Sequence, residues 1–207
     1  MVRRIEQPSS VDHDRVVEIY LKAAQIFHQK GFDATSMSDI AEGVNLTKAG
    51  LYYYISSKEE LLFAIMDYAM TLLQDRVIVP SSAIENPERR LEFCIEEHAR
   101  LVMGDAKVIS ILTDEMAGLS AEHQRQMRNR KRVYFDLIRD SLNALMEQGK
   151  LRPMDTTVAA FSMFGAIMWL PRWYDPSGGK GSDEIIRELK NSLLYGMLGV
   201  PRDRAAE

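Results

Sequence analysis

The sequence of 207 residues predicts an all-α fold, and three observations support this prediction. Apolar side chains recur three or four residues apart along most of the chain, which places them on one face of successive helices. No segment alternates apolar and polar residues beside hairpin turns, as strands would. Glycines and prolines interrupt the helical pattern between these segments, so they mark the loops.

The first expected helix covers residues 12–31. Asp12 and Asp14 near its start suit the positive end of the helix dipole, and Gly31 ends it. Its apolar face is expected to consist of Val16, Ile19, Tyr20, Ala23, Ala24 and Phe27. This face needs a partner, which the following segment can supply.

A pair of short helices joined by a tight turn is expected next. Ser36 and Ser38 can cap the first of them, and Gly43 and Asn45 break it where the turn is needed. The inward face of this helix is expected to carry Ile40, Ala41 and Val44.

The second helix of the pair can be capped by Thr47, and it faces inward through Leu51 and Ile55, four residues apart. A solvated helix surface normally carries Glu, Lys and Gln. The outward positions here are instead one cation, two residues with almost no side chain and two aromatic hydroxyls, namely Lys48, Ala49, Gly50, Tyr52 and Tyr53. Such a surface can approach a polyanion closely.

This helix pair resembles the DNA-binding domain of the TetR family of transcriptional regulators. Four signature elements of that family stand in register, namely Ile40-Ala41, Gly43-Val44, Leu51-Tyr52 and Ser57-Lys58-Glu59-Glu60-Leu61. One departure is Ile55, where the family often has Phe, another apolar residue. The resemblance covers about residues 12–75 and implies a helix-turn-helix reader of DNA.

Ten residues are expected to contact DNA: Ser36, Ser38, Thr47, Lys48, Ala49, Gly50, Tyr52, Tyr53, Tyr54 and Lys58. Lys48 can reach a base edge or a phosphate, and the tyrosines can donate to phosphates. Lys58, at the start of the next helix, can attract a phosphate together with the free backbone N–H groups there. Other roles are open: capping explains the serines, packing can share Tyr54, and Lys48 would otherwise be an ordinary surface lysine.

The resemblance implies an N-terminal three-helix DNA-binding domain over residues 1–58 and a C-terminal helical domain for ligand binding and dimerisation over residues 59–207. A linking helix over residues 57–79 joins them and is expected to stop at Pro80, because proline disrupts a helix interior.

Further helical segments are expected in the C-terminal domain, where Asn86-Pro87 opens the first, Ser120 caps the long one and Ser182 caps the last. They cover residues 87–104, 108–112, 120–148, 155–170 and 182–197, with a Gly- and Pro-rich loop at 175–181. The last two helices are apolar over more than one face, which calls for cover on every side. A second copy of the chain, forming a homodimer through these helices, is the expected cover, and burial within one subunit is the alternative.

A ligand site is expected in the second domain, at Met116, Arg128, Phe164, Met168, Trp169, Arg172 and Trp173. The stretch Trp169–Pro176 resembles a TetR subgroup that includes acyl-CoA-responsive repressors of fatty-acid and sterol breakdown, although Pro171 interrupts its pattern. A lipophilic acid or its CoA thioester is therefore the expected effector. An aromatic core or interface, and a solvated basic face at Arg125–Arg132, are the alternatives.

Charge alone does not indicate nucleic-acid binding, because the formal net charge is −4 and residues 1–58 carry seven basic and seven acidic side chains. The N-terminus lacks the apolar core of a secretory signal, and the single Cys94 suits a reducing cytoplasm. No membrane span is expected, since the uncharged run at residues 156–171 is too short and mixed.

The function expected from these features is a ligand-responsive repressor that binds double-stranded operator DNA as a homodimer and is released by a small lipophilic effector. No enzyme activity, cofactor or metal is expected, because no Gly-rich phosphate loop or Cys-x-x-Cys is present and the four histidines are scattered. A non-inducible architectural DNA-binding protein, and a helical enzyme or carrier, are the rival interpretations.

Overall fold

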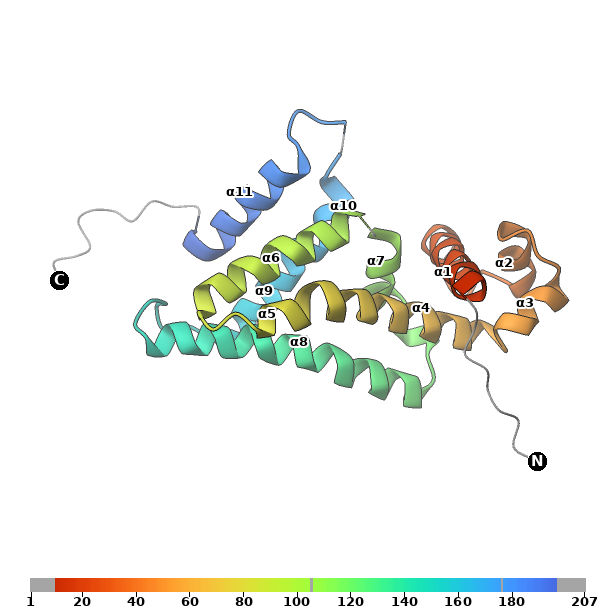
Figure 1. Cartoon of the computed structure of the whole chain (residues 1–207), viewed down its shortest axis with the longest axis horizontal. Helices are drawn as coiled ribbons and strands as arrows, with labels where there is room; N and C mark the ends of the chain where they lie inside the picture. The colour runs from red at the N-terminus through yellow and green to blue at the C-terminus, as the bar shows by residue number, and fades with distance from the viewer. Residues whose placement is uncertain (1–9, 105, 176, 197–207) are drawn as a thin grey trace. The chain divides into compact units, whose positions relative to one another are not determined.

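The computed structural model describes residues 10–104, 106–175 and 177–196 (Figure 1). All regular structure in these ranges is helical, which confirms the all-α prediction. The helices run in the order α1 Ser10–Lys30, α2 Met37–Gly43, α3 Lys48–Tyr54, α4 Lys58–Leu73, a π-helix Gln74–Ile78 (η1), α5 Val79–Ser82, α6 Pro87–Gly104, α7 Ala106–Asp114, a 3₁₀ turn Met116–Gly118 (η2), α8 Ala121–Glu147, α9 Thr156–Met168, α10 Leu170–Trp173 and α11 Ser182–Tyr195.

Contacts between backbone positions divide the chain into two compact units. Unit 1 contains the described residues up to Thr71 together with those from 106 to Lys131. Unit 2 contains Leu72–Gly104 and the described residues from Arg132 onward. Unit 1 thus includes a segment, 106–131, that the expected division at residue 58 places in the C-terminal domain.

Unit 1 forms around α1, which packs against α2 and α7, while α2 packs against α3. The expected apolar faces of these helices are buried, since Phe27, Ile40 and Leu51 are fully enclosed. Leu61 and Leu62 at the start of α4 are also fully buried. Burial of each such side chain contributes about 1.5–3 kcal/mol, so these contacts hold the short helices in place.

The caps of the two short helices explain where each begins. Ser36 caps α2 through a reciprocal pair with Asp39: the Ser36 Oγ accepts from the Asp39 N–H at 3.2 Å, and the Asp39 carboxylate accepts from the Ser36 N–H at 2.8 Å. Thr47 caps α3 through the Gly50 N–H. Between the two helices, Asn45 has a φ of 55°, a conformation that Asn tolerates well. Ser38 lies inside α2 and is not its cap.

The prediction that the fourth helix stops at Pro80 is wrong. The chain passes from α4 into the π-helical segment η1 and then into α5, which holds Pro80 in its first turn. In η1 the Val79 N–H bonds back to the Gln74 carbonyl, five residues away. This wider turn precedes the proline, and the missing N–H of a proline is tolerated in the first turn of a new helix.

Unit 2 is organised by α6, which packs against η1, α5, α9, α10 and α11 (Figure 1). Asn86 caps α6 as expected, since its Oδ1 accepts from the N–H groups of Glu88 and Arg89. One face of α6 is buried, including Leu91, Cys94 and His98.

The last two expected helices differ in detail from the prediction. The apolar helix that Asp155 caps ends at Met168, and a short separate helix, α10, follows with Pro171 in its first turn. The N-cap of α11 is Gly181, so Ser182 does not cap it as predicted. Met197, at the end of the expected last helix over residues 182–197, lies outside the described residues. No helix in the described part of the chain is long and apolar enough to cross a membrane.

Candidate nucleic-acid interface

The outward face of α3 carries the residues that the sequence assigns to DNA contact. Lys48, Ala49, Tyr52 and Tyr53 are exposed, with 83% of the Tyr53 surface accessible. Fully buried Leu51 anchors the opposite face. No acidic residue lies within α3. A single buried anchor therefore presents a cation and two phenol groups outward on a seven-residue helix.

The local structure of α3 gives a reason for glycine at position 50 that does not involve DNA. A Cβ built on Gly50 would lie 3.2 Å from the Thr47 Oγ1, which is the atom that caps α3. The Gly50 N–H donates to that same oxygen at 3.0 Å. Glycine at this position therefore leaves room for the cap, in addition to any close approach to DNA.

The remaining residues expected to contact DNA differ in how exposed they are and in whether they already have a partner. Ser36, Ser38 and Thr47 are exposed, but Ser36 and Thr47 are already engaged as helix caps. Tyr54 is half-buried, and its ring meets the Tyr53 ring edge-on with centroids 5.2 Å apart. At the end of α3, Tyr53 thus faces outward, whereas Tyr54 is partly used in packing.

Lys58 is occupied within unit 1. Its Nζ donates to the backbone carbonyls of Phe32, Asp33 and Thr35 at 2.8, 3.3 and 2.9 Å. It also lies over the Phe32 ring, 4.4 Å from the centroid. The ammonium therefore clamps the loop between α1 and α2 onto the start of α4. This geometry assigns Lys58 a positioning role that its place in the sequence motif does not reveal.

Five of the seven expected effector residues lie in unit 2, and they are not equally placed. Half-buried Phe164 meets the rings of His98 and Tyr134 edge-on, with centroids 6.2 and 5.1 Å away. Trp169 and Trp173 are more than half exposed, and the Arg172 guanidinium lies 4.9 Å from the Trp169 ring centroid. Half-buried Met168 completes this group.

His98 and Tyr134 form a buried polar pair that the sequence did not single out. The His98 Nδ1 lies 3.4 Å from the Tyr134 hydroxyl, and both side chains are buried in unit 2. Burial lowers the pKa of His98 to about 4 and raises the pKa of Tyr134 well above its usual value. Both groups are therefore neutral at pH 7. Their sequence signal is weak, because a lone histidine or tyrosine on an apolar helix face is common in cores.

The other two expected effector residues, Met116 and Arg128, belong to unit 1. Met116 is half-buried in η2, whereas Arg128 is exposed and donates to the Gln124 side chain. The basic run around Arg128 is largely engaged locally, since Arg130 pairs with Asp67 and the Lys131 ammonium donates to the Leu112 carbonyl. Arg130 and Lys131 are therefore held by partners inside unit 1, so the run is neither a fully solvated face nor a row of free cations for a CoA phosphate.

A surface hollow of about 360 Å³ lies beside α1 and α2 in unit 1. Its lining is mostly charged and amide side chains, including Lys22, Lys30, Asp39 and Glu42. This lining does not suit a lipophilic ligand.

Large apolar side chains are exposed on the helices expected to dimerise. They are Val158 and Phe161 on α9, Trp169 and Trp173 around α10, and Tyr195 on α11. Phe161 packs on Phe135 of α8 yet keeps 62% of its surface accessible. We call these five residues the apolar face of unit 2.

The chain matches two family models. Residues 19–65 match the model of bacterial regulatory proteins of the tetR family, and residues 85–197 match that of the tetracyclin repressor-like C-terminal domain. The second match spans more than half of the chain and contains α6 through α11.

Similar proteins include the HTH-type transcriptional repressor KstR2 of Mycobacterium tuberculosis, 26% identical over 186 residues that cover 87% of this chain and 91% of KstR2. The crystal structure of AibR in complex with isovaleryl coenzyme A and operator DNA is 36% identical, with a TM-score of 0.80 and coverage of 87% of this chain and 98% of AibR. PfmR of Thermus thermophilus is 28% identical, with a TM-score of 0.77 and coverage of 87% and 99%. With its helix-turn-helix and C-terminal helices both matched, this chain belongs to the TetR family of transcriptional regulators.

Proposed function

We propose that this protein is a transcriptional repressor that binds operator DNA as a homodimer and leaves it when an acyl-CoA binds. The observation that carries the proposal is the outward face of α3, where Lys48, Tyr52 and Tyr53 are exposed on a helix anchored by Leu51. The 36% identity to AibR, whose structure holds operator DNA and isovaleryl coenzyme A together, supports these two ligands, while release by the effector is decided by the test below. Acting on DNA and CoA esters, the protein would work in the cytoplasm.

In this proposal α3 enters the major groove. Lys48 binds a base edge or a phosphate, and the hydroxyls of Tyr52 and Tyr53 donate to the backbone. Phosphates would lie beside Ser38 and the capping residues Ser36 and Thr47. The small side chains of Ala49 and Gly50 would let the backbone of α3 come close to the DNA. Two subunits would read half-sites about 34–36 Å apart, one turn of DNA. Lys58 acts indirectly, by holding the loop that positions α2.

The homodimer is proposed to form through the apolar face of unit 2. Five large apolar side chains on α9 to α11 are exposed to water in the single subunit, and a partner that covered them together would bury this apolar area. Removing them from water across a two-fold axis would supply the hydrophobic core that a stable dimer needs.

The acyl group of the effector is proposed to bind in unit 2 near Phe164 and Met168, where half-buried apolar side chains adjoin the neutral pair His98 and Tyr134. A neutral imidazole and a phenol can hydrogen-bond a thioester carbonyl without the desolvation penalty of a buried charge. Arg172 is exposed beside Trp169 and would meet the polar part of the effector, whereas Trp169 and Trp173 belong to the proposed dimer interface. The effector acts only through its higher affinity for the conformation that does not bind DNA.

The test is operator binding measured by fluorescence anisotropy, with the operator taken from the promoter region beside the encoding gene. Wild-type protein should bind and should be released by isovaleryl-CoA or a longer acyl-CoA, with free CoA as the control. Lys48→Ala should weaken operator binding while the dimer remains folded. Binding that no acyl-CoA reverses would favour a non-inducible architectural protein, and no DNA binding at all would refute the proposal.

A further inference from the structure

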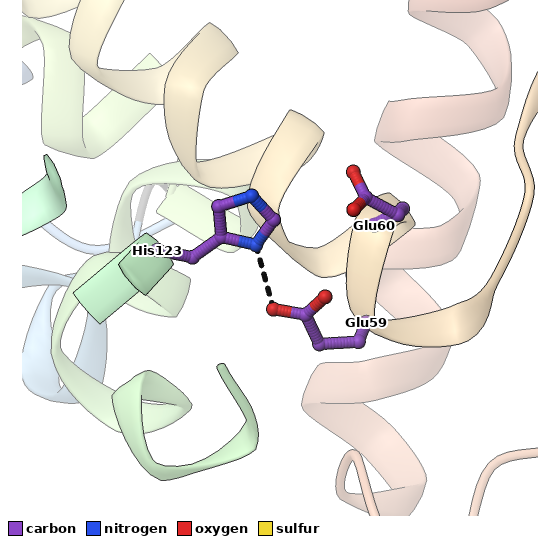
Figure 2. Close-up of side chains that lie close together, drawn as sticks. All are labelled: Glu59, Glu60 and His123. Atoms are coloured by element: carbon purple, nitrogen blue, oxygen red, sulfur yellow. Dashed lines mark hydrogen bonds and ion pairs between the residues drawn. The ribbon is translucent and has the colours of Figure 1, made fainter. Parts of the chain in front are cut away.

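Three metal-ligating side chains from distant parts of the sequence meet within unit 1. Glu59 and Glu60 stand in the first turn of α4, and His123 stands in the first turn of α8. One ligand atom from each residue lies within 4.8 Å of the other two. Figure 2 shows the His123 ring facing the Glu59 carboxylate, with Glu60 beside them. The four histidines are scattered in the sequence, so the spacing gave no sign of this cluster.

Local structure fixes two of these side chains before any ligand arrives. The His123 ring stacks on the Phe63 ring, with centroids 3.8 Å apart and planes 7° from parallel. The Glu59 Oε1 accepts the Ser120 N–H at 2.8 Å and lies 2.7 Å from the His123 Nδ1. The contacts from Phe63 and Ser120, which are not ligands themselves, are of the kind that orients the ligands of metal sites.

The charge of the cluster favours a cation. Within the described ranges neither carboxylate has an ion pair with Lys or Arg, and the His123 ring shares a hydrogen bond of 2.7 Å with Glu59. The Glu60 carboxylate is half-buried beside this pair. With a neutral imidazole the cluster carries two negative charges, which a divalent ion would balance.

We propose that Glu59, Glu60 and His123 bind one divalent transition-metal ion of the zinc class. One imidazole nitrogen with two carboxylate oxygens suits a borderline ion such as Zn²⁺ or Co²⁺, with water at the open position. Ligands about 2.1 Å from a common ion are about 3.4 Å apart in tetrahedral geometry, so atoms up to 4.8 Å apart must close by up to about 1.4 Å, and the Glu59 and His123 atoms, now 2.7 Å apart, must separate by about 0.7 Å. Glu60 can provide most of this movement by rotating its side chain.

The ion would replace the hydrogen bond between the His123 Nδ1 and Glu59 with two coordinate bonds. It would thereby tie the first turn of α4 to the first turn of α8, residues that are far apart in sequence but both in unit 1. Glu59 directly follows Lys58, which clamps the loop before α2. Bound metal should therefore stiffen the scaffold that carries the helix-turn-helix.

The experiment is a titration of chelator-treated, full-length protein with CoCl₂, followed by visible absorption, and with ZnCl₂, followed by calorimetry. The expected result is one ion per subunit and a rise in Tm with Zn²⁺. Glu60→Gln and His123→Gln should each weaken binding at least about tenfold. His28→Gln, which changes an exposed histidine of α1, is the matched control and should bind as the wild type does.

Two outcomes would overturn the proposal: no binding of either ion at millimolar concentration, or binding that Glu60→Gln and His123→Gln leave unchanged. Glu60→Gln keeps the test valid if His123→Gln unfolds, because Glu60 is not part of the hydrogen bond between Glu59 and His123. All of these measurements are made without DNA or acyl-CoA, so they are independent of the proposed repressor function.

Discussion

Replacing Lys58 separates two roles that the sequence motif and the structure suggest for it. Lys58→Met keeps an apolar side chain of similar length but removes the ammonium that donates to three backbone carbonyls and lies over the Phe32 ring. Hydrogen bonds to charged groups contribute about 1.5–3 kcal/mol each, but these three share one half-exposed donor whose ordering opposes them. We expect a loss of about 2 kcal/mol, which lowers Tm by about 4–8 °C in a chain of this size.

The matched variant is Lys48→Met, which removes an exposed ammonium from α3. Thermal unfolding should be unchanged. In operator titrations, each phosphate contact contributes about 0.9 to the slope of log K against log salt, so losing one per subunit should lower the slope of the dimer by about 1.8. Lys58→Met should leave that slope unchanged at temperatures where the protein is folded.

An exchange of the two results would contradict the role of Lys58 as a clamp on the loop. A Lys58→Met protein with wild-type Tm and a slope reduced by about 1.8 would mean that its ammonium binds phosphate rather than the loop carbonyls.

Three further changes test other parts of the structure. Gly118→Ala would place a Cβ 2.7 Å from the Phe32 ring and should destabilise the protein by about 1–3 kcal/mol in urea unfolding, whereas Gly104→Ala, which meets nothing within 4 Å, should not. His98 has its pKa lowered from 6.5 to about 4 by burial, so the unfolded state binds the proton first. Stability should therefore fall on the order of 3 kcal/mol as the pH drops from 6.5 to about 4, and His98→Gln should flatten this dependence in urea titrations at several pH values. Phe161→Glu puts a charge on the apolar face of unit 2 and should convert the dimer to a monomer in light scattering; a persistent dimer would place the interface elsewhere.

Local signals predicted most of the fold. The caps at Ser36 and Thr47, the turn at Asn45 and the buried stripe ending in Leu51 depend on residues only a few positions apart, and such interactions are encoded in short segments. The prediction of a helix end at Pro80 was wrong because the backbone widens into the π-helical turn η1 just before it. Pro80 then lies in the first turn of α5, where its missing N–H is tolerated.

The sequence by itself determined the helical class, the helix-turn-helix and the outward face of α3, since each follows from spacing along one or two helices. Tertiary structure alone decided that Lys58 clamps a loop more than twenty residues earlier, and that His98 meets Tyr134. It also decided that Glu59, Glu60 and His123 converge. The physical reason is that a side chain's partners depend on which helices pack together, and periodicity shows which face is buried but not what covers it.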